Sequence, residues 1–221
     1  MKKIEFAFIL RRLATILAVS ILTLSLTAAV TGILLAFYYE PAAGGAYGSL
    51  RKVTTEVDNG WLIQSFHAIA GNGIIVISLL QIIVMFLGRS FAPSWLTAWI
   101  SGILLTLTAI ALSWTAIILD WTQIGYWRFR IELGTLEAIP WIGPQLRTLV
   151  TGGETIGTVT LQHLYALHSY IFSIAAILLS VIHLIGLLIQ EQEEDPIDAL
   201  PTSSDASPSG GLASGAERLQ S

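Results

Sequence analysis

The sequence has no cysteine and little charge: its 221 residues include 11 lysines and arginines and 15 aspartates and glutamates. Without cysteine the chain has no disulfide, no thiolate metal ligand and no haem attached through thioether bonds. Hydrophobic residues make up 54% of it and the mean hydropathy is +0.72, which excludes an ordinary soluble domain. The composition predicts an integral membrane protein that lies in lipid, and nothing in it suggests a nucleic-acid partner.

Four stretches without Asp, Glu, Lys or Arg are long enough to cross a hydrocarbon core, which takes roughly 20 helical residues. In lipid every backbone polar group needs an internal partner, so each stretch is expected to be a helix. We predict an all-α membrane protein, a four-helix bundle in one domain, residues 13–190. Its spans are expected at about 13–37, 62–87, 95–119 and 161–188.

The segments outside the spans differ in character. Residues 1–12 form an N-terminal segment with four basic residues, which favours cytoplasmic termini, although the opposite loops are also basic. Residues 38–60 have the Pro and Gly content of a connector. The aromatic loop 120–154, between spans three and four, predicts short interfacial helices. Residues 191–221 are acidic and then rich in Ser, Pro and Gly, as expected of a disordered tail.

Three histidines lie inside the apolar stretches: His67, His168 and His183. The last two are fifteen residues apart, on roughly the same side of one helix and about 22 Å apart along it. An imidazole in hydrocarbon is costly without a partner. Each alone is compatible with a hydrogen bond to a carbonyl or with a proton relay, but together they favour a cofactor in the bundle core. Haem fits best, because its iron accepts two axial imidazoles within an apolar slot.

The chain resembles the cytochrome b6 family, the haem-binding four-helix subunits equivalent to the N-terminal half of cytochrome b. The resemblance rests on "TGILLAFYYEP" at 31–41, "AYGSLRKVTTEVDNGWLIQSFH" at 46–67, "WTQIGYWRFRIELGTLEAIPWIGP" at 121–144 and "TIGTVTLQHLYALHSY" at 155–170. It implies a haem-b electron-transfer subunit, rather than a stand-alone enzyme, in quinol-linked photosynthetic or respiratory transport. It also implies a thylakoid or bacterial plasma membrane and partner subunits of a cytochrome b6f-like complex.

The resemblance makes His67 and His168 the axial ligands of an outer-side haem, remote from the chain termini. His183 is a candidate ligand of a second haem, but Gln81 stands where its partner histidine is expected, and an amide is a poor ligand for haem iron. Three outcomes stay open at this site. In the first, the haem is absent and Gln81 forms a hydrogen bond with His183. In the second, the haem binds through His183, with Gln81 or water as a weak second ligand. In the third, Met85 is the second ligand.

Other positions bear on the haem pockets by the same resemblance. Gly32 and Gly102 match small residues that let a porphyrin edge approach the backbone, whereas Ala18 and Ala116 replace glycines. His163 replaces an arginine and is a candidate propionate contact, or simply an interfacial histidine. The basic residues expected beside the first ligand are Gln64 and Ala68, and Ile16 replaces the cysteine that anchors a covalent haem in the family.

The resemblance also places a quinone pocket in the loop after the third span. Its residues here are Trp121, Gln123, Gly125, Tyr126 and Trp127, which are equally explained by packing on the bundle. A full pocket requires another subunit, because the chain has only four spans. The rival hypothesis is a non-catalytic accessory or assembly subunit that keeps the bundle with one haem or none.

Overall fold

The computed structural model describes residues 2–88 and 95–193, with side chains over 8–88 and 95–190. Within those ranges the secondary structure is helical. The helices are α1 (Lys2–Ala36), α2 (Ala46–Glu56), α3 (Gly60–Leu87), α4 (Leu96–Leu119), α5 (Gln123–Glu137), α6 (Gly143–Thr151), α7 (Thr158–Ala166), the π-helical turn η2 (Leu167–Phe172) and α8 (Ser173–Glu193).

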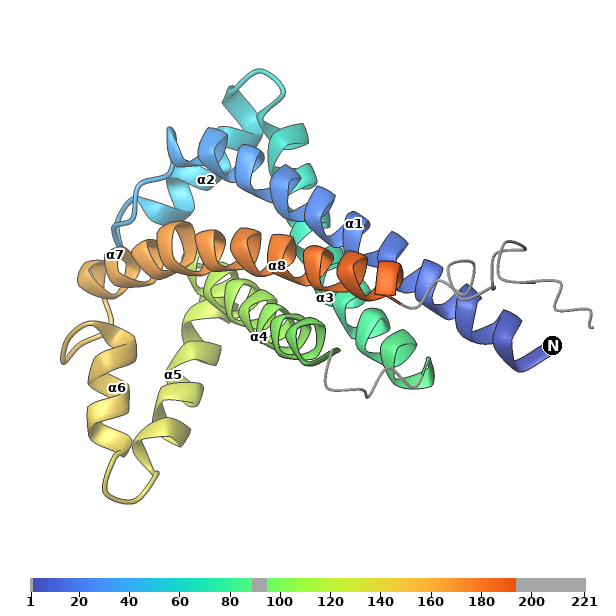
Figure 1. Ribbon diagram of the computed structural model, residues 1–221. Helices are drawn as coiled ribbons and strands as arrows, with labels where there is room; N and C mark the ends of the chain where they lie inside the picture. Colours follow the sequence, from blue (N-terminus) through green and yellow to red (C-terminus); the bar gives the residue numbers. More distant parts are fainter. Residues whose placement is uncertain (1, 89–94, 194–221) are drawn as a thin grey trace, which may run out of the picture.

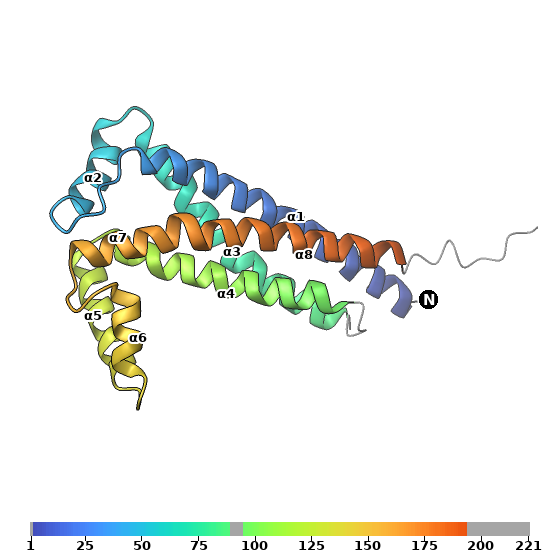
Figure 2. The same ribbon diagram turned by 60° about the vertical axis from the view of Figure 1, so that its left-hand side comes forward.

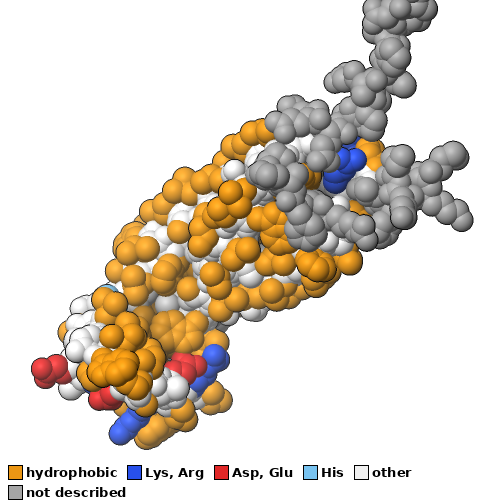
Figure 3. Space-filling model, turned by 60° about the horizontal axis from the view of Figure 1, so that its bottom comes forward, with side chains coloured by type: hydrophobic (Ala, Val, Ile, Leu, Met, Phe, Trp, Pro, Cys, Tyr) orange, Lys and Arg blue, Asp and Glu red, His pale blue; other side chains and the backbone are white. Residues whose placement is uncertain are grey.

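Four segments are long and apolar enough to cross a membrane: Phe8–Ala36, Gly60–Leu87, Leu96–Leu119 and Thr158–Gln190. Their outward side chains are hydrophobic, and apolar atoms cover the body of the face in Figure 3, where charged side chains lie at its ends. A surface of this kind is stable against lipid tails, where outward apolar side chains need no burial. The expected all-α, four-span membrane fold is confirmed.

The helices that carry the histidines lie diagonally in the bundle. Among the described residues, α3 packs mainly on α1 and α4, and α8 packs mainly on the same two helices. Figures 1 and 2 show α1, α3, α4 and α8 running together, with the start of α1 and the end of α8 at one end. Side chains from α3 and α8 therefore project toward each other between two flanking helices.

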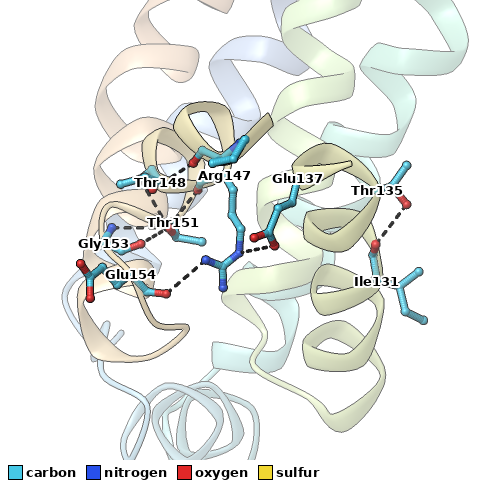
Figure 4. A network of polar contacts seen from close by, with 9 residues as sticks. Ile131, Thr135, Glu137, Arg147, Thr148, Thr151, Gly153 and Glu154 are labelled. Atoms are coloured by element: carbon cyan, nitrogen blue, oxygen red, sulfur yellow. Dashed lines mark hydrogen bonds and ion pairs between the residues drawn. The ribbon is translucent and has the colours of Figure 1, made fainter. Parts of the chain in front are cut away.

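The loop after α4 folds into a helical hairpin, as expected for short helices in this segment. Helices α5 and α6 project from the end of the bundle opposite the N-terminus (Figures 1 and 2). Arg147 joins the two helices, with its Nε 3.3 Å from Glu137 Oε2 and its Nη1 donating to the Glu154 carbonyl (Figure 4). Thr151 closes α6 through hydrogen bonds to its own turn and to Gly153.

Some boundaries differ from the sequence-based expectations. Helix α1 begins at Lys2, so residues 2–12 belong to the same helix as the first span, whose apolar part begins at Phe8. The connector 38–60 contains α2, which buries Ala46 and Val53. This helix was not predicted, because the glycines of the segment are typical of turns. The fourth span begins at Thr158, and helix α8 includes residues 191–193 of the expected tail. Residues 194–221, the rest of that tail, lie outside the described residues.

Candidate cofactor site

His67 is held against α1 by its Nδ1 atom. Nδ1 lies 2.9 Å from the carbonyl oxygen of Ala28 and 3.2 Å from Thr31 Oγ1. A carbonyl oxygen can only accept, so Nδ1 carries the proton and Nε2 keeps its lone pair. Gly32 completes the contact, because a Cβ there would lie 3.0 Å from His67 Cε1. The ring is thus oriented as a neutral imidazole with a free ligand atom.

His168 is held against α4 in a related way. Its Nδ1 lies 2.8 Å from Thr115 Oγ1, and that hydroxyl bonds the carbonyls of Ala111 and Leu112 at 2.9 Å each. Since the hydroxyl proton goes to a carbonyl, Nδ1 of His168 is the donor to Oγ1. Nε2 of His168 is therefore also free to bind a metal.

His67 and His168 lie close enough to share one iron. Their ring centroids are 6.3 Å apart and their planes are inclined by 53°. An imidazole nitrogen binds a transition metal at about 2 Å, so the centres of two axial imidazoles on one metal lie about 6 Å apart. The observed spacing fits that requirement, and so does the donor chemistry of two neutral imidazoles. The residues of this site fit a haem iron.

His183 has the same surroundings as His67. Its Nδ1 lies 2.9 Å from the carbonyl oxygen of Ala98 and 3.3 Å from Ser101 Oγ1, and a Cβ on Gly102 would lie 2.9 Å from its Cε1. We call such a set a cradle: a carbonyl at position i, a hydroxyl at i+3 and a small residue at i+4. Buried Nε2 of His183 has no hydrogen-bond partner.

Gln81 is buried on α3 and its side chain has no partner either. Both amide atoms are buried without a hydrogen bond, so the structure contains no Gln81–His183 bond. Met85, one turn further along α3, packs in an apolar cluster with Ala14, Ala18 and Leu187. The donor set here is one imidazole and one amide, so the site fits a haem iron from the His183 side only.

The hydroxyl members of the cradles were not expected from the sequence. Thr31, Ser101 and Thr115 each orient a histidine. Serine and threonine in apolar helices commonly form hydrogen bonds with their own helix, so their presence in the sequence does not indicate a site. A signal was present in the spacing. "AAVTG" at 28–32 and "AWISG" at 98–102 repeat a carbonyl, hydroxyl and glycine pattern on two helices. Both glycines contact imidazoles in the structure.

The remaining candidates near the haem pockets lie on α7 and near the start of α3. His163 is half-buried on α7 and packs against Gly152: a Cβ added to Gly152 would lie 2.8 Å from the Cβ of His163. Gln64 is half-buried and Ala68 is exposed. The structure leaves the propionate role of His163 a prediction.

Three of the loop residues assigned to a quinone pocket form a group of edge-to-face aromatic rings. Trp121 and Tyr126 have ring centroids 5.6 Å apart, and Tyr126 and Trp127 have theirs 5.4 Å apart, both edge-on. Gln123 Oε1 accepts from Trp127 Nε1 at 3.1 Å. Gly125 lets α5 approach α4, since a Cβ there would lie 2.5 Å from the Ile117 carbonyl oxygen. These contacts account for the residues by packing and leave quinone binding a prediction.

Two ionisable groups sit where this loop joins the bundle. Burial and the nearby Asp120 carboxylate raise the pKa of Tyr39, whose hydroxyl donates to the Leu119 carbonyl at 2.8 Å. Burial also raises the pKa of Asp120. Because burial disfavours the charged form of both groups, their surroundings are poorly hydrated.

Comparison with known proteins agrees with the resemblance. A family model described as cytochrome b/b6/petB matches residues 1–192. The chain belongs to the cytochrome b/b6 family. Cytochrome b6 of a Synechocystis species is 33% identical over 162 residues, 73% of this chain and 72% of the relative. Cytochrome b6 of Synechococcus elongatus is 32% identical over 162 residues, 73% of this chain and 74% of the relative.

A solved structure shares the fold. A chain of a hyperthermophilic respiratory Complex III superposes with a TM-score of 0.67 and 25% identity. The match covers 90% of this chain and 52% of that chain, so the present chain spans about half its length. The family and the fold support a multi-pass membrane cytochrome b that serves electron transfer, and cytochromes of this family generally bind b-type haem.

Proposed function

We propose that this cytochrome b holds one b-type haem between His67 and His168 and carries electrons within a membrane complex. The observation that supports it is the pair itself. Two imidazoles from diagonal helices have centroids 6.3 Å apart, and both Nδ1 atoms are already engaged by the flanking helices. When bound, the haem supplies one-electron chemistry that side chains lack.

The protein's own contribution is orientation and exclusion of water. The Ala28 carbonyl and the Thr115 hydroxyl fix the ring tautomers, which presents Nε2 of each histidine without further reorganisation. The surrounding helices supply the apolar walls. Hydrogen bonds at Nδ1 also raise the basicity of an imidazole ligand, which favours the oxidised metal and lowers the reduction potential.

The relatives support a proposal about the partners. A curated relative is named cytochrome b6, and the solved structure belongs to a respiratory Complex III. We propose that the chain is a subunit of such an assembly, with quinone contacted by the Trp121–Trp127 loop and completed by another subunit. The end of the bundle with the N-terminus carries Arg11 and Arg12, so we place both ends of the chain in the cytoplasm.

A second candidate function is favoured by Gln81. Because Gln81 stands in place of a ligand histidine, the chain lacks one of the four axial imidazoles that a relay of two bis-histidine haems requires. An accessory or assembly subunit that keeps the bundle with one haem or none would tolerate this loss. Haem content separates the two functions, because the accessory function alone permits a haem-free protein.

The experiment is haem quantitation in histidine variants of the full chain. The protein is expressed with ample haem, purified in detergent and analysed as the pyridine haemochrome, with the reduced spectrum recorded. We expect a low-spin α-band that His67→Ala and His168→Ala each abolish. His163→Ala removes an imidazole that is a candidate propionate contact but not a proposed axial ligand, so it should keep the low-spin band. A colourless wild-type protein, or an unchanged spectrum in His168→Ala, contradicts the proposal.

A further inference from the structure

The cradles recur with a fixed spacing on α1 and α4. On α4 they occupy positions 98, 101 and 102 and positions 112, 115 and 116, fourteen residues apart. On α1 one cradle occupies positions 28, 31 and 32, and fourteen residues earlier are positions 14, 17 and 18. Since fourteen helical residues rise about 21 Å, the four sets lie at two levels of the bundle.

The fourth corner, at positions 14, 17 and 18, is built differently. The hydroxyl position is Leu17 and the glycine position is Ala18, and both belong to an apolar cluster with Val84 and Met85 of α3. The residue of α3 at this level is Gln81, fourteen positions beyond His67. The imidazole and the hydroxyl that would orient it are therefore missing together, so this corner is shaped for something other than an axial histidine.

The opposite corner at the same level keeps every part of a ligand site. His183 is 1% exposed, and its Nδ1 is held by the Ala98 carbonyl and Ser101. A glycine inside a helix lowers helix stability relative to alanine. At Gly102 the missing side chain leaves room for the imidazole of His183, which packs directly against it. The site therefore retains a ring oriented for coordination through Nε2.

Buried polar atoms at this level have no partner. Among the described residues, buried side-chain atoms without a hydrogen bond are His183 Nε2, both amide atoms of Gln81, and Gln190 Oε1. Gln81 is 1% exposed, as is His183. Buried polar groups in native proteins are almost always paired, so a ligand that both His183 and Gln81 contact would account for the His183 and Gln81 atoms. Gln190, seven residues further along α8, lies outside this level.

We propose that the inner site holds a haem ligated by His183 alone, with its sixth position open to a small diatomic molecule. Gln81 is the distal residue: its amide faces the open position and donates N–H to the bound molecule without coordinating the iron. Met85 does not take that place, because it is packed in the apolar cluster one turn away. The inference goes beyond the proposed function, which concerns the His67–His168 haem only.

Carbon monoxide is the probe, because it binds ferrous haem only where a coordination position is open. The full chain, reduced with dithionite in detergent, should contain about two haems per polypeptide. Its carbon monoxide difference spectrum should correspond to about one of them. The double variant His67→Ala with His168→Ala should lose the low-spin haem and keep this signal. His183→Ala should lose the signal and one haem.

A gain-of-ligand variant tests the fourth corner directly. Leu17→Ser, Ala18→Gly and Gln81→His together rebuild the cradle and its histidine, and we expect a second low-spin haem with the carbon monoxide signal lost. Gln81→Leu should keep carbon monoxide binding but release it roughly 2- to 12-fold faster, as expected for one lost hydrogen bond. In that variant the C–O stretch should move to higher wavenumber.

Three results would overturn the inference. They are no carbon monoxide binding by the wild-type protein, only one haem that disappears with His67 and His168, or carbon monoxide binding that persists in the rebuilt variant. Failure of the proposed function is distinguishable, because it would leave the wild-type protein without a low-spin band whatever carbon monoxide does at His183.

Discussion

The two cradle types predict how the outer haem responds to mutation. At His67, whose cradle ends in Gly32, Nδ1 bonds the carbonyl at 2.9 Å and the hydroxyl more loosely at 3.2 Å. At His168, whose cradle ends in Ala116, Nδ1 bonds the hydroxyl at 2.8 Å. A methyl group at the last cradle position therefore goes with a closer approach of Nδ1 to the hydroxyl, beside the backbone hydrogen bond that His168 keeps to Leu112.

Gly32→Ala should impose the second arrangement on His67. The new Cβ would lie 3.0 Å from Cε1, whereas carbon atoms in contact prefer about 3.5 to 4.0 Å, so the ring moves by roughly half an ångström or more. Nδ1 then leaves the Ala28 carbonyl and takes Thr31 Oγ1. Because one good acceptor remains, we expect haem release to quicken by no more than about threefold, or roughly 0.6 kcal/mol.

The double variant removes both acceptors. Thr31→Val alone leaves the carbonyl bond and should also have a small effect, whereas Gly32→Ala with Thr31→Val leaves Nδ1 without a partner. Loss of an outer-shell partner typically weakens metal binding about 10- to 100-fold, or roughly 1.4 to 2.8 kcal/mol. The two changes are thus strongly non-additive, as expected when two groups serve one atom.

The assay is haem transfer from each variant to excess apomyoglobin, together with the midpoint potential of the outer haem. Gly71→Ala is the matched control, because it also adds a methyl group to a helical glycine but has nothing within 4 Å. It should release haem at the wild-type rate. The reasoning is refuted if Gly32→Ala alone matches the double variant, or if the double variant matches Gly71→Ala.

Three further changes test other parts of the structure. Thr115→Val should by itself weaken haem retention about 10-fold or more, since His168 relies on that hydroxyl; equality with Thr31→Val would contradict this. Burial raises the pKa of Asp120, so its charge destabilises the fold once pH exceeds about 4; Asp120→Asn should raise the melting temperature at pH 7 and not at pH 3. Deleting Tyr170 should convert η2 to α-helix and keep the haem spectrum. Deleting Ile177, which lies between η2 and His183, should turn His183 out of its cradle and lose the carbon monoxide signal.

The sequence predicted the spans and the histidine pair because both depend on strong physical constraints. Long uncharged stretches have one stable form in lipid, and an imidazole within them is too costly to be incidental. Helix α2 was missed because its eleven residues include Gly48 and follow two more glycines, which suggest a turn. Its stability comes from burying Ala46 and Val53 against the bundle, a tertiary effect that local composition does not reveal.

The polar contacts at the histidines were predicted only in part, for a different reason. The glycines were expected to admit a porphyrin edge, while in the structure Gly32 and Gly102 face the imidazoles themselves. Thr31, Ser101 and Thr115 gave no separate signal, because a hydroxyl in a membrane helix usually bonds the carbonyl three or four residues before it. Those hydroxyls do make such bonds, and the histidine contact is an additional one that appears only when two helices are placed together.

One discrepancy in the sequence is resolved by the π-helical turn. His67 and Gln81 are fourteen residues apart on α3, as are the cradles on α1 and α4, but His168 and His183 are fifteen apart. In a regular α-helix a spacing of fifteen residues places two side chains about 60° apart around the axis, and a spacing of fourteen about 40° apart in the opposite sense, so the extra residue turns one histidine by about 100° from the fourteen-residue register. The π-helical turn Leu167–Phe172 has one residue more per turn than an α-helix; it contains His168 and ends before His183. It returns the fourth span to the fourteen-residue register of its neighbours, so that His168 and His183 both reach cradles on α4. Such turns are frequent at functional sites, and here the irregular segment allows one helix to present histidines at two levels of the bundle.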